Sequence, residues 1–292
     1  MRRNLAGTLR VWSRVIKLNR CLPIALSAGF GFILQRPMPD AALGGVVAGV
    51  LLLACGCAGL NSVQEARMDR LYRRTCDRPV ATGLVRRGHA LALSATLVAL
   101  GLGILFAGNP SRLPPLLGLA AVCLYNGLYT PLKQVSVFAL VPGGLAGGLP
   151  PLIGWTAAGG GLADLRPWLL FALFFLWQIP HYCLILLRHR DDYRAVAQPS
   201  LIRLFSESLL KNITLVWVGA LAVVAMTLAL DRDLLQPGSR LTLAGMAVFL
   251  VLFLGQRLLR TQADDRLPLW LFNGVFFSAL LVVALVQLLA AG

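Results

Sequence analysis

Long apolar stretches separated by short polar turns make up most of this chain. Each stretch approaches the roughly 20 residues that a helix needs to cross the hydrocarbon core of a bilayer. Charged residues, or Pro and Gly, mark the turns between them. The pattern predicts nine membrane-spanning helices, near residues 16–34, 41–60, 89–107, 114–130, 135–156, 167–187, 212–230, 240–257 and 268–291.

The fifth stretch differs from the others because it contains Pro142, Pro150 and Pro151 among several glycines. These residue types interrupt helices, and non-helical backbone at membrane depth needs protein or a cavity beside it. We therefore predict that this span is broken and bends around a pocket inside the bundle.

Composition supports a membrane protein, since 58% of the residues are hydrophobic and only 13% are charged. Such a balance excludes an ordinary soluble domain. The apolar runs are also too long and too numerous for a cleaved signal peptide. We expect an all-α, polytopic bundle of about nine helices with a central cavity, forming a single membrane domain over residues 1–292. Its basic segment, residues 1–15, is expected to lie at the membrane interface.

The basic residues divide unequally between the two sides of this predicted topology. Twenty-two Lys and Arg fall on the side of the amino terminus and five on the other. Because such residues accumulate in cytoplasmic loops, we expect a cytoplasmic amino terminus and an external carboxyl terminus in a bacterial inner membrane. The net charge of +15 is explained without a nucleic-acid partner. A basic cytoplasmic surface also attracts anionic substrates.

Polar residues at helical spacing follow the second span directly, in Asn61-Ser-Val-Gln-Glu65-Ala-Arg-Met-Asp69. If the helix continues, the side chains of Asn61, Glu65 and Asp69 share one stripe, about 6 Å apart. Such a stripe suits a divalent cation, and carboxylates at the end of a membrane helix are costly without a positive partner. The alternative interpretation is a solvated helix end.

A second polar loop follows the sixth span, four helices later, with the sequence Arg188-His-Arg-Asp191-Asp192-Tyr193-Arg194. The two cytoplasmic loops, residues 61–88 and 188–211, suggest two related halves with a site between them. Carboxylates and cations together suit a diphosphate, because magnesium binds one or two carboxylates along with phosphate oxygens while Arg and Lys take the remaining charge. A long apolar tail would lie among the helices, so the pattern indicates a prenyl diphosphate substrate.

These residues resemble the signature of the UbiA-type intramembrane prenyltransferases, which has the form N-x-x-x-D-x-x-x-D after the second helix. Asn61 and Asp69 match it, whereas Glu65 replaces the middle aspartate and extends its oxygens by one methylene. The segment Arg74-Thr-Cys-Asp-Arg78-Pro resembles the R-T-x-x-R-P that continues the signature.

Within that superfamily the chain, from about residue 15 to its end, is most similar to the protoheme IX farnesyltransferase branch. The similarity rests on Tyr129-Thr-Pro-Leu-Lys133, Gly148-Leu-Pro-Pro-Leu-Ile-Gly-Trp155, Phe175-Leu-Trp-Gln-Ile-Pro-His181 and Asp192-Tyr193. Two positions depart from that branch: Gln134 replaces a usual basic residue, and His189 replaces a usual arginine.

The resemblance implies transfer of a farnesyl group from farnesyl diphosphate to a vinyl group of haem b, which gives haem O. It implies catalytic roles and Mg²⁺ ligation for Asn61, Glu65, Asp69 and Asp192, with Asp191 assisting at the metal. The substrate-binding residues that it implies are Arg74, Arg78, Tyr129, Lys133, Trp177, His181, Arg188, Asp191 and Tyr193. A partner that exchanges haem, such as a haem O oxidising enzyme or an oxidase assembly factor, follows from the resemblance alone.

Breaking an allylic carbon–oxygen bond requires a dry environment in which aromatic faces stabilise the developing cation. Tyr125, Tyr129, Trp155, Trp177 and Tyr182 are available for this. His181 has two interpretations: a hydrogen-bond partner between helices, or a contact to haem that includes ligation of its iron.

Two rival functions stay open. One is a related prenyltransferase with a quinone precursor or a chlorin as acceptor. The other is a transporter or lipid-binding protein that has lost catalysis, although coupled transporters usually carry ionisable groups near mid-membrane.

Overall fold

The computed structural model describes residues 5–196, 199–260 and 266–291, so parts of the predicted amino-terminal segment and of the second loop lie outside the described residues. Within these ranges the chain forms helices and turns and no strand. The elements are α1 (Leu5–Val15), α2 (Leu18–Gln35), α3 (Ala41–Gln64), α4 (Ala66–Asp69), α5 (Arg87–Ala107), α6 (Leu113–Val122), η1 (Cys123–Tyr129), α7 (Thr130–Leu132), η2 (Val137–Ala139), α8 (Leu140–Ala157), α9 (Leu165–Arg188), α10 (Arg190–Ala195), α11 (Leu201–Leu204), α12 (Glu207–Leu230), α13 (Pro237–Leu259) and α14 (Arg266–Ala291).

The predicted all-α membrane bundle is confirmed. Among the described residues, eight segments are long and apolar enough to cross a bilayer. The remaining predicted span corresponds to α2, whose hydropathy is reduced by Asn19 and Arg20 in its first turn and Gln35 at its end. Hydropathy therefore locates the helices well, because the need to satisfy backbone groups in lipid forces each apolar stretch to be helical.

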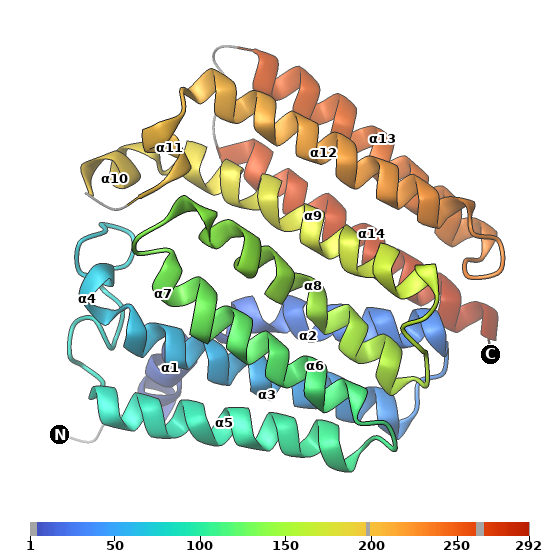
Figure 1. Ribbon diagram of the computed structural model, residues 1–292, viewed down its shortest axis with the longest axis horizontal. Coiled ribbons are helices and arrows are strands. Elements are labelled where there is room, and N and C mark those ends of the chain that lie inside the picture. The colour runs from blue at the N-terminus through green and yellow to red at the C-terminus, as the bar shows by residue number, and fades with distance from the viewer. Residues whose placement is uncertain (1–4, 197–198, 261–265, 292) are drawn as a thin grey trace.

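The long helices lie side by side, and the short helices α4, α10 and α11 gather at one end of the bundle (Figure 1). The carboxyl terminus lies at the opposite end. Helix α3 packs against α5 and α2, while α9 packs against α8 and α12. This arrangement brings the loops that follow α3 and α9 to the same end of the molecule.

The predicted break in the fifth span is wrong, because α8 is helical from Leu140 to Ala157 with Pro150 and Pro151 inside it. Its glycines instead permit close packing. A Cβ atom on Gly154 would lie 1.8 Å from the carbonyl oxygen of Ala28 in α2. Small residues of this kind let the backbones of membrane helices approach one another.

A π-helical segment, η1, joins α6 to α7 within the span Leu113–Leu132. Thr130 follows it and donates from Oγ1 to the carbonyl oxygen of Tyr125, five residues earlier, over 2.8 Å. Wider turns of this type occur mostly in short stretches and frequently at functional sites. Here the wide turn comes directly before the polar turn that contains Lys133.

The contact between α2 and α8 predicts a specific sensitivity to added volume. Gly154→Ala should reduce the free energy of unfolding by about 1–3 kcal/mol, because the added methyl group overlaps a backbone carbonyl that cannot move freely. Thermal unfolding in detergent measures the effect. Gly245→Ala in α13 is the matched control, since a Cβ there meets nothing within 4 Å. Equal melting temperatures for the two variants would contradict the close contact.

Candidate active site

The polar stripe at the end of α3 is buried. Backbone hydrogen bonds from Glu65 N to Asn61 O (2.9 Å) and from Asp69 N to Glu65 O (2.8 Å) carry the helical spacing from α3 into α4. Asn61, Glu65 and Asp69 are only 1%, 6% and 5% exposed. The alternative of a solvated helix end is therefore wrong. Buried carboxylates require partners, because an unpaired charge in the protein interior is costly.

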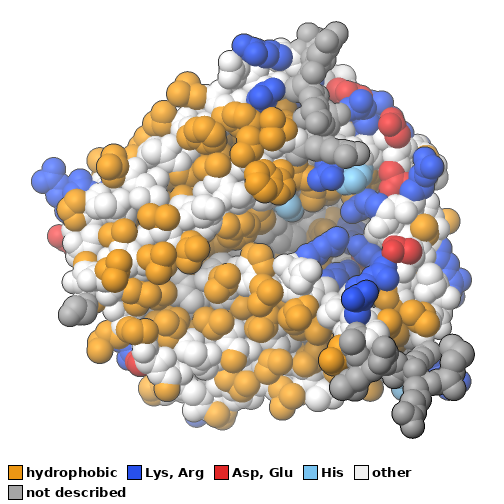
Figure 2. Space-filling view, turned by 180° about the vertical axis from the view of Figure 1, so that it is seen from behind, with side chains coloured by type: hydrophobic (Ala, Val, Ile, Leu, Met, Phe, Trp, Pro, Cys, Tyr) orange, Lys and Arg blue, Asp and Glu red, His pale blue; other side chains and the backbone are white. Residues whose placement is uncertain are grey.

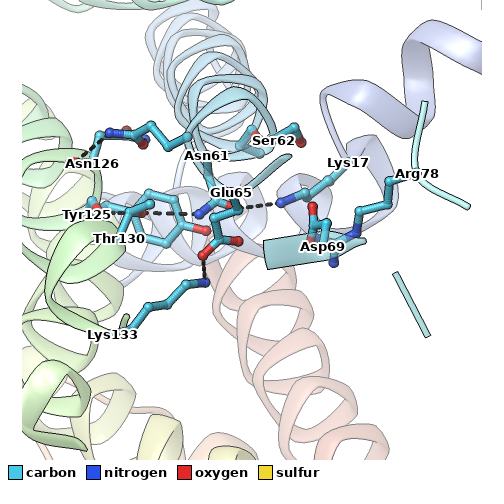
Figure 3. Close-up of polar contacts among 12 residues, drawn as sticks. Lys17, Asn61, Ser62, Glu65, Asp69, Arg78, Tyr125, Asn126, Thr130 and Lys133 are labelled. Atoms are coloured by element: carbon cyan, nitrogen blue, oxygen red, sulfur yellow. Dashed lines mark hydrogen bonds and ion pairs between the residues drawn. The ribbon is translucent and has the colours of Figure 1, made fainter. Parts of the chain in front are cut away.

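Both carboxylates of the stripe are paired with predicted substrate-binding residues (Figure 3). Lys133, which directly follows α7, forms an ion pair with Glu65. Arg78 donates from Nη1 to both carboxylate oxygens of Asp69, over 2.7 and 2.8 Å. Thr75 fixes the intervening loop by donating from Oγ1 to the carbonyl oxygen of Asp69 over 2.8 Å. The motif around Arg78 thus folds back onto the helix end that precedes it.

The amide of Asn61 joins two residues that the sequence analysis did not assign to the site. Lys17, between α1 and α2, donates from Nζ to Asn61 Oδ1 over 2.5 Å, and Asn61 Nδ2 donates to Thr130 Oγ1 over 3.1 Å (Figure 3). Lys17 has a left-handed backbone conformation, with φ of 52°, which is uncommon outside glycine and concentrates at functional sites. From the sequence, Lys17 is only one of the basic residues that indicate topology. Thr130 lies inside the motif Tyr129-Thr-Pro-Leu-Lys133.

Positive charge is crowded at this end of the bundle. Burial, together with the nearby charge of Arg78, lowers the pKa of Lys17 to about 7. Burial also lowers the pKa of Lys133 to about 7, with Lys17 and Arg20 contributing in the same direction. Each lysine would hold its proton more firmly if an anion arrived beside it. The site is therefore suited to a multiply charged anion.

The second polar loop contacts the first, as the predicted convergence of the two loops requires. Asp192 Oδ1 accepts a hydrogen bond from the backbone N–H of Arg73 over 3.0 Å, and its Oδ2 lies 4.0 Å from Arg74 Nε. The guanidinium of Arg74 donates to the hydroxyl of Tyr193 and lies 5.0 Å from the centre of that ring. The rings of Tyr72 and Tyr193 are 5.4 Å apart. Arg74, Asp192 and Tyr193 thus belong to one cluster.

Carboxylate oxygens are the side-chain ligands that magnesium prefers. The described residues contain no group of three or more His, Cys, Asp and Glu that could hold a metal ion, and Glu65 and Asp69 are each paired with a cation. However, Asp192 Oδ2 is buried and makes no hydrogen bond with any described residue. A buried carboxylate oxygen without a donor is a ready ligand for a hard cation. Asp191 and Arg188, two other predicted site residues, are exposed at the same loop.

Aromatic side chains border the polar end of the bundle. Tyr129 in η1 stacks on Tyr125, with ring centres 5.3 Å apart, and Lys133 Nζ lies 5.0 Å from the centre of the Tyr129 ring. In α9 the ring of His181 stacks on Trp177 with a centre-to-centre distance of 4.6 Å. Of the predicted substrate-binding residues, Tyr129 lies in η1, and Trp177 and His181 lie in α9. Helix α8 packs against both of these elements.

A hollow opens in the surface where Lys and Arg side chains gather, and hydrophobic side chains border its other side (Figure 2). A separate cavity of about 270 Å³ lies at the other end of the bundle, lined by residues that include Trp155, Arg166 and Gln287. Trp155 donates from Nε1 to the carbonyl oxygen of Gly161 there. Trp155 therefore differs in location from the other aromatic candidates, because it lies at the end of α8 away from Lys133.

Comparison with known proteins identifies the family. A sequence profile of the UbiA prenyltransferase family matches residues 22–281. The chain belongs to the UbiA prenyltransferase family. A protoheme IX farnesyltransferase of Geobacter sulfurreducens is 45% identical over 179 residues, which cover 60% of this chain and 64% of that protein, just under two thirds of its length. A protoheme IX farnesyltransferase of Nitratidesulfovibrio vulgaris is 35% identical over 242 residues, covering 82% of this chain and 81% of that protein.

Solved structures of UbiA homologues share the fold. The apo UbiA homologue of Aeropyrum pernix K1 aligns with a TM-score of 0.75 at 19% identity, covering 94% of this chain and 98% of that one. A UbiA homologue of Archaeoglobus fulgidus bound to GPP and Mg²⁺ aligns with a TM-score of 0.70 at 16% identity, covering 95% of this chain and 99% of that one. At such identities these similarities establish the architecture alone.

The crowded cations predict binding of inorganic pyrophosphate in the presence of Mg²⁺, which should raise the melting temperature of the protein. At 100 times the dissociation constant the stabilisation is about 2.7 kcal/mol. A Glu65→Gln, Lys133→Gln double variant should lose most of this gain without leaving a charge unpaired. Arg86→Gln is the control, because Arg86 is exposed at the start of α5.

An equal pyrophosphate-induced shift in the double variant and in Arg86→Gln would contradict the assigned anion site. Loss of the shift in both would mean that general surface charge, and not the buried cluster, attracts the anion.

Proposed function

We propose that this chain transfers a farnesyl group from farnesyl diphosphate to a vinyl group of haem b, releasing diphosphate and producing haem O. The observation that carries this proposal is the buried pairing of Glu65 with Lys133 and of Asp69 with Arg78, next to a wall of aromatic side chains. The protoheme IX farnesyltransferases that share 35–45% identity with the chain support haem as the acceptor.

The paired ions explain how such a site accepts its substrate. Asn61, Glu65, Asp69 and Asp192 would hold Mg²⁺, which neutralises the diphosphate and makes it a better leaving group. Arg78 and Lys133 would bind diphosphate oxygens, helped by Arg74 and Arg188. Because a magnesium diphosphate carries charges of both signs, Glu65 and Asp69 could pair with the metal, and Lys133 and Arg78 with the diphosphate, without any charge becoming unpaired.

The transfer itself is a substitution at an allylic carbon. The carbon–oxygen bond breaks with its electron pair leaving on diphosphate, and the π electrons of the vinyl group form the new carbon–carbon bond. Water then adds to the resulting cation and a proton is lost, which completes the hydroxyl group of haem O. Tyr129, which lies beside Lys133, would stabilise the allylic cation through its ring. Trp177 is covered by His181 and Phe276, so it would contribute by excluding water.

The excess of basic residues on one side supports a cytoplasmic location for this site in a bacterial inner membrane, with the amino terminus inside and the carboxyl terminus outside. Delivery of haem b or removal of haem O by an oxidising enzyme or an oxidase assembly factor would then take place at the membrane.

A reconstituted assay tests the proposal most directly. Purified protein, haem b, farnesyl diphosphate and Mg²⁺ should yield haem O, detected by mass spectrometry, and chelation of the metal should stop the reaction. Asp69→Ala should lower the rate by at least about a hundredfold, since it removes a group that stabilises charge developing in the transition state. Glu65→Asp tests the longer side chain and should retain activity if Glu65 is a metal ligand.

The acceptor distinguishes the rival functions. A prenylated aromatic acid or chlorin in place of haem O would favour another member of the family, and binding of farnesyl diphosphate without any product would favour a non-catalytic protein. Full activity of Asp69→Ala would show that the stripe of Asn61, Glu65 and Asp69 does not bind the metal. If Asp69→Ala loses activity while Glu65→Gln keeps full activity, only Glu65 is removed from the proposed metal ligands.

His181 gives a second, independent prediction about the acceptor. His181→Ala should weaken haem binding and change the Soret band of the bound haem, while leaving the pyrophosphate-induced melting shift intact. Titration of haem into the purified variant measures both quantities. An unchanged haem spectrum together with unchanged activity would exclude contact between His181 and haem.

A further inference from the structure

A stack of aromatic rings joins α9 to α14 beside His181. The Trp177 indole packs against rings of α14, with its centre 5.5 Å from that of Phe276 and 6.4 Å from that of Phe272, and with both rings nearly parallel to it. His181 stacks on Trp177. Trp177 is 8% exposed, whereas His181 is half-buried, so the imidazole is the accessible end of this stack.

Asn273 in α14 fixes the orientation of that imidazole. Asn273 Nδ2 donates to the carbonyl oxygen of Leu269 over 2.9 Å, which leaves its Oδ1 facing His181 Nδ1 at 2.9 Å. An amide oxygen can only accept, so the hydrogen of a neutral imidazole must reside on Nδ1. Nε2 then carries a lone pair, and among the described residues it makes no hydrogen bond.

We propose that Asn273 is a positioning residue that holds His181 in the Nδ1–H tautomer and presents the Nε2 lone pair to the iron of the haem acceptor. The proposal rests on the proposed function. Histidines that ligate metals usually donate their other ring hydrogen to an oxygen, which fixes the ring and raises its basicity. The link between Leu269, Asn273 and His181 has this form, with the amide oxygen as the acceptor.

Replacing Asn273 with residues of similar size separates this role from simple packing. Asn273→Leu removes the acceptor and should weaken binding of haem b by about tenfold, with a shifted Soret band. Asn273→Asp keeps an acceptor in the same place, so it should restore binding and lower the reduction potential of the bound haem, because the added negative charge favours the ferric state. Packing alone would predict the opposite order, since a partly buried carboxylate between apolar helices is costlier than a leucine there.

The measurements are a spectroscopic haem titration and a redox titration on the full chain in detergent, without farnesyl diphosphate. Gln287→Leu is the matched control, because Gln287 is an amide of α14 that donates to the carbonyl oxygen of Leu234 at the other end of the bundle. It should reduce thermal stability and leave the haem spectrum unchanged. The pyrophosphate-induced melting shift should be retained in all three variants.

The outcomes distinguish this proposal from the one on which it rests. If the wild-type protein binds no haem b, both proposals fail. If the wild type binds haem and Asn273→Leu binds it with the same affinity and spectrum, the role of Asn273 is overturned and the proposed function stands. The role is equally overturned if Asn273→Asp is no better than Asn273→Leu.

Discussion

Burial of charge at the end of α3 is the constraint on which the site depends. A carboxylate removed from water costs several kcal/mol unless a cation and hydrogen bonds compensate it. Glu65 and Asp69 are buried, and their partners Lys133 and Arg78 come from other parts of the chain. The segments after α4 and α7 must therefore close on α3 whenever the protein is folded, and the junction before α2 joins them through Lys17.

This closure separates the molecule into two environments. The body of the bundle is apolar and packed tightly enough that α2 and α8 touch backbone to backbone. The polar end holds the ions and the two contacting loops (Figure 1). A substrate with a charged head and a long hydrocarbon tail would match both environments at once, and its reactive bond would lie at their boundary. The aromatic ring of Tyr129 is found near that boundary, beside Lys133.

Hydropathy was sufficient to predict the helices, because each span must satisfy its own backbone within lipid. The stripe of Asn61, Glu65 and Asp69 was predictable for a similar reason, since its spacing is local. The partners were harder to predict. Lys17 and Thr130 meet Asn61 only after distant helices pack, and the contact of Asn273 with His181 spans 92 residues. Nothing in local periodicity distinguishes these residues from neighbouring polar ones.

The glycines of α8 show the opposite error. Propensity for water-soluble helices made them look like a break, whereas in a membrane bundle they serve close packing. Glycine and proline within a helical stretch therefore indicate different structures in water and in a membrane. A prediction from sequence has to ask what surrounds a small residue as well as what the residue prefers.

The position of Lys133 at the polar end of the bundle depends on the number of residues in the π-helical segment η1. Successive residues of an α-helix are about 100° apart around its axis, so a helix that gained or lost one residue would present a different face beyond that point. Lys133 follows η1 by only a few residues, and its contact with Glu65 uses the face that the wide turn sets. Related chains would accordingly tolerate few insertions or deletions within Cys123–Tyr129, because a change of one residue there would turn Lys133 away from Glu65.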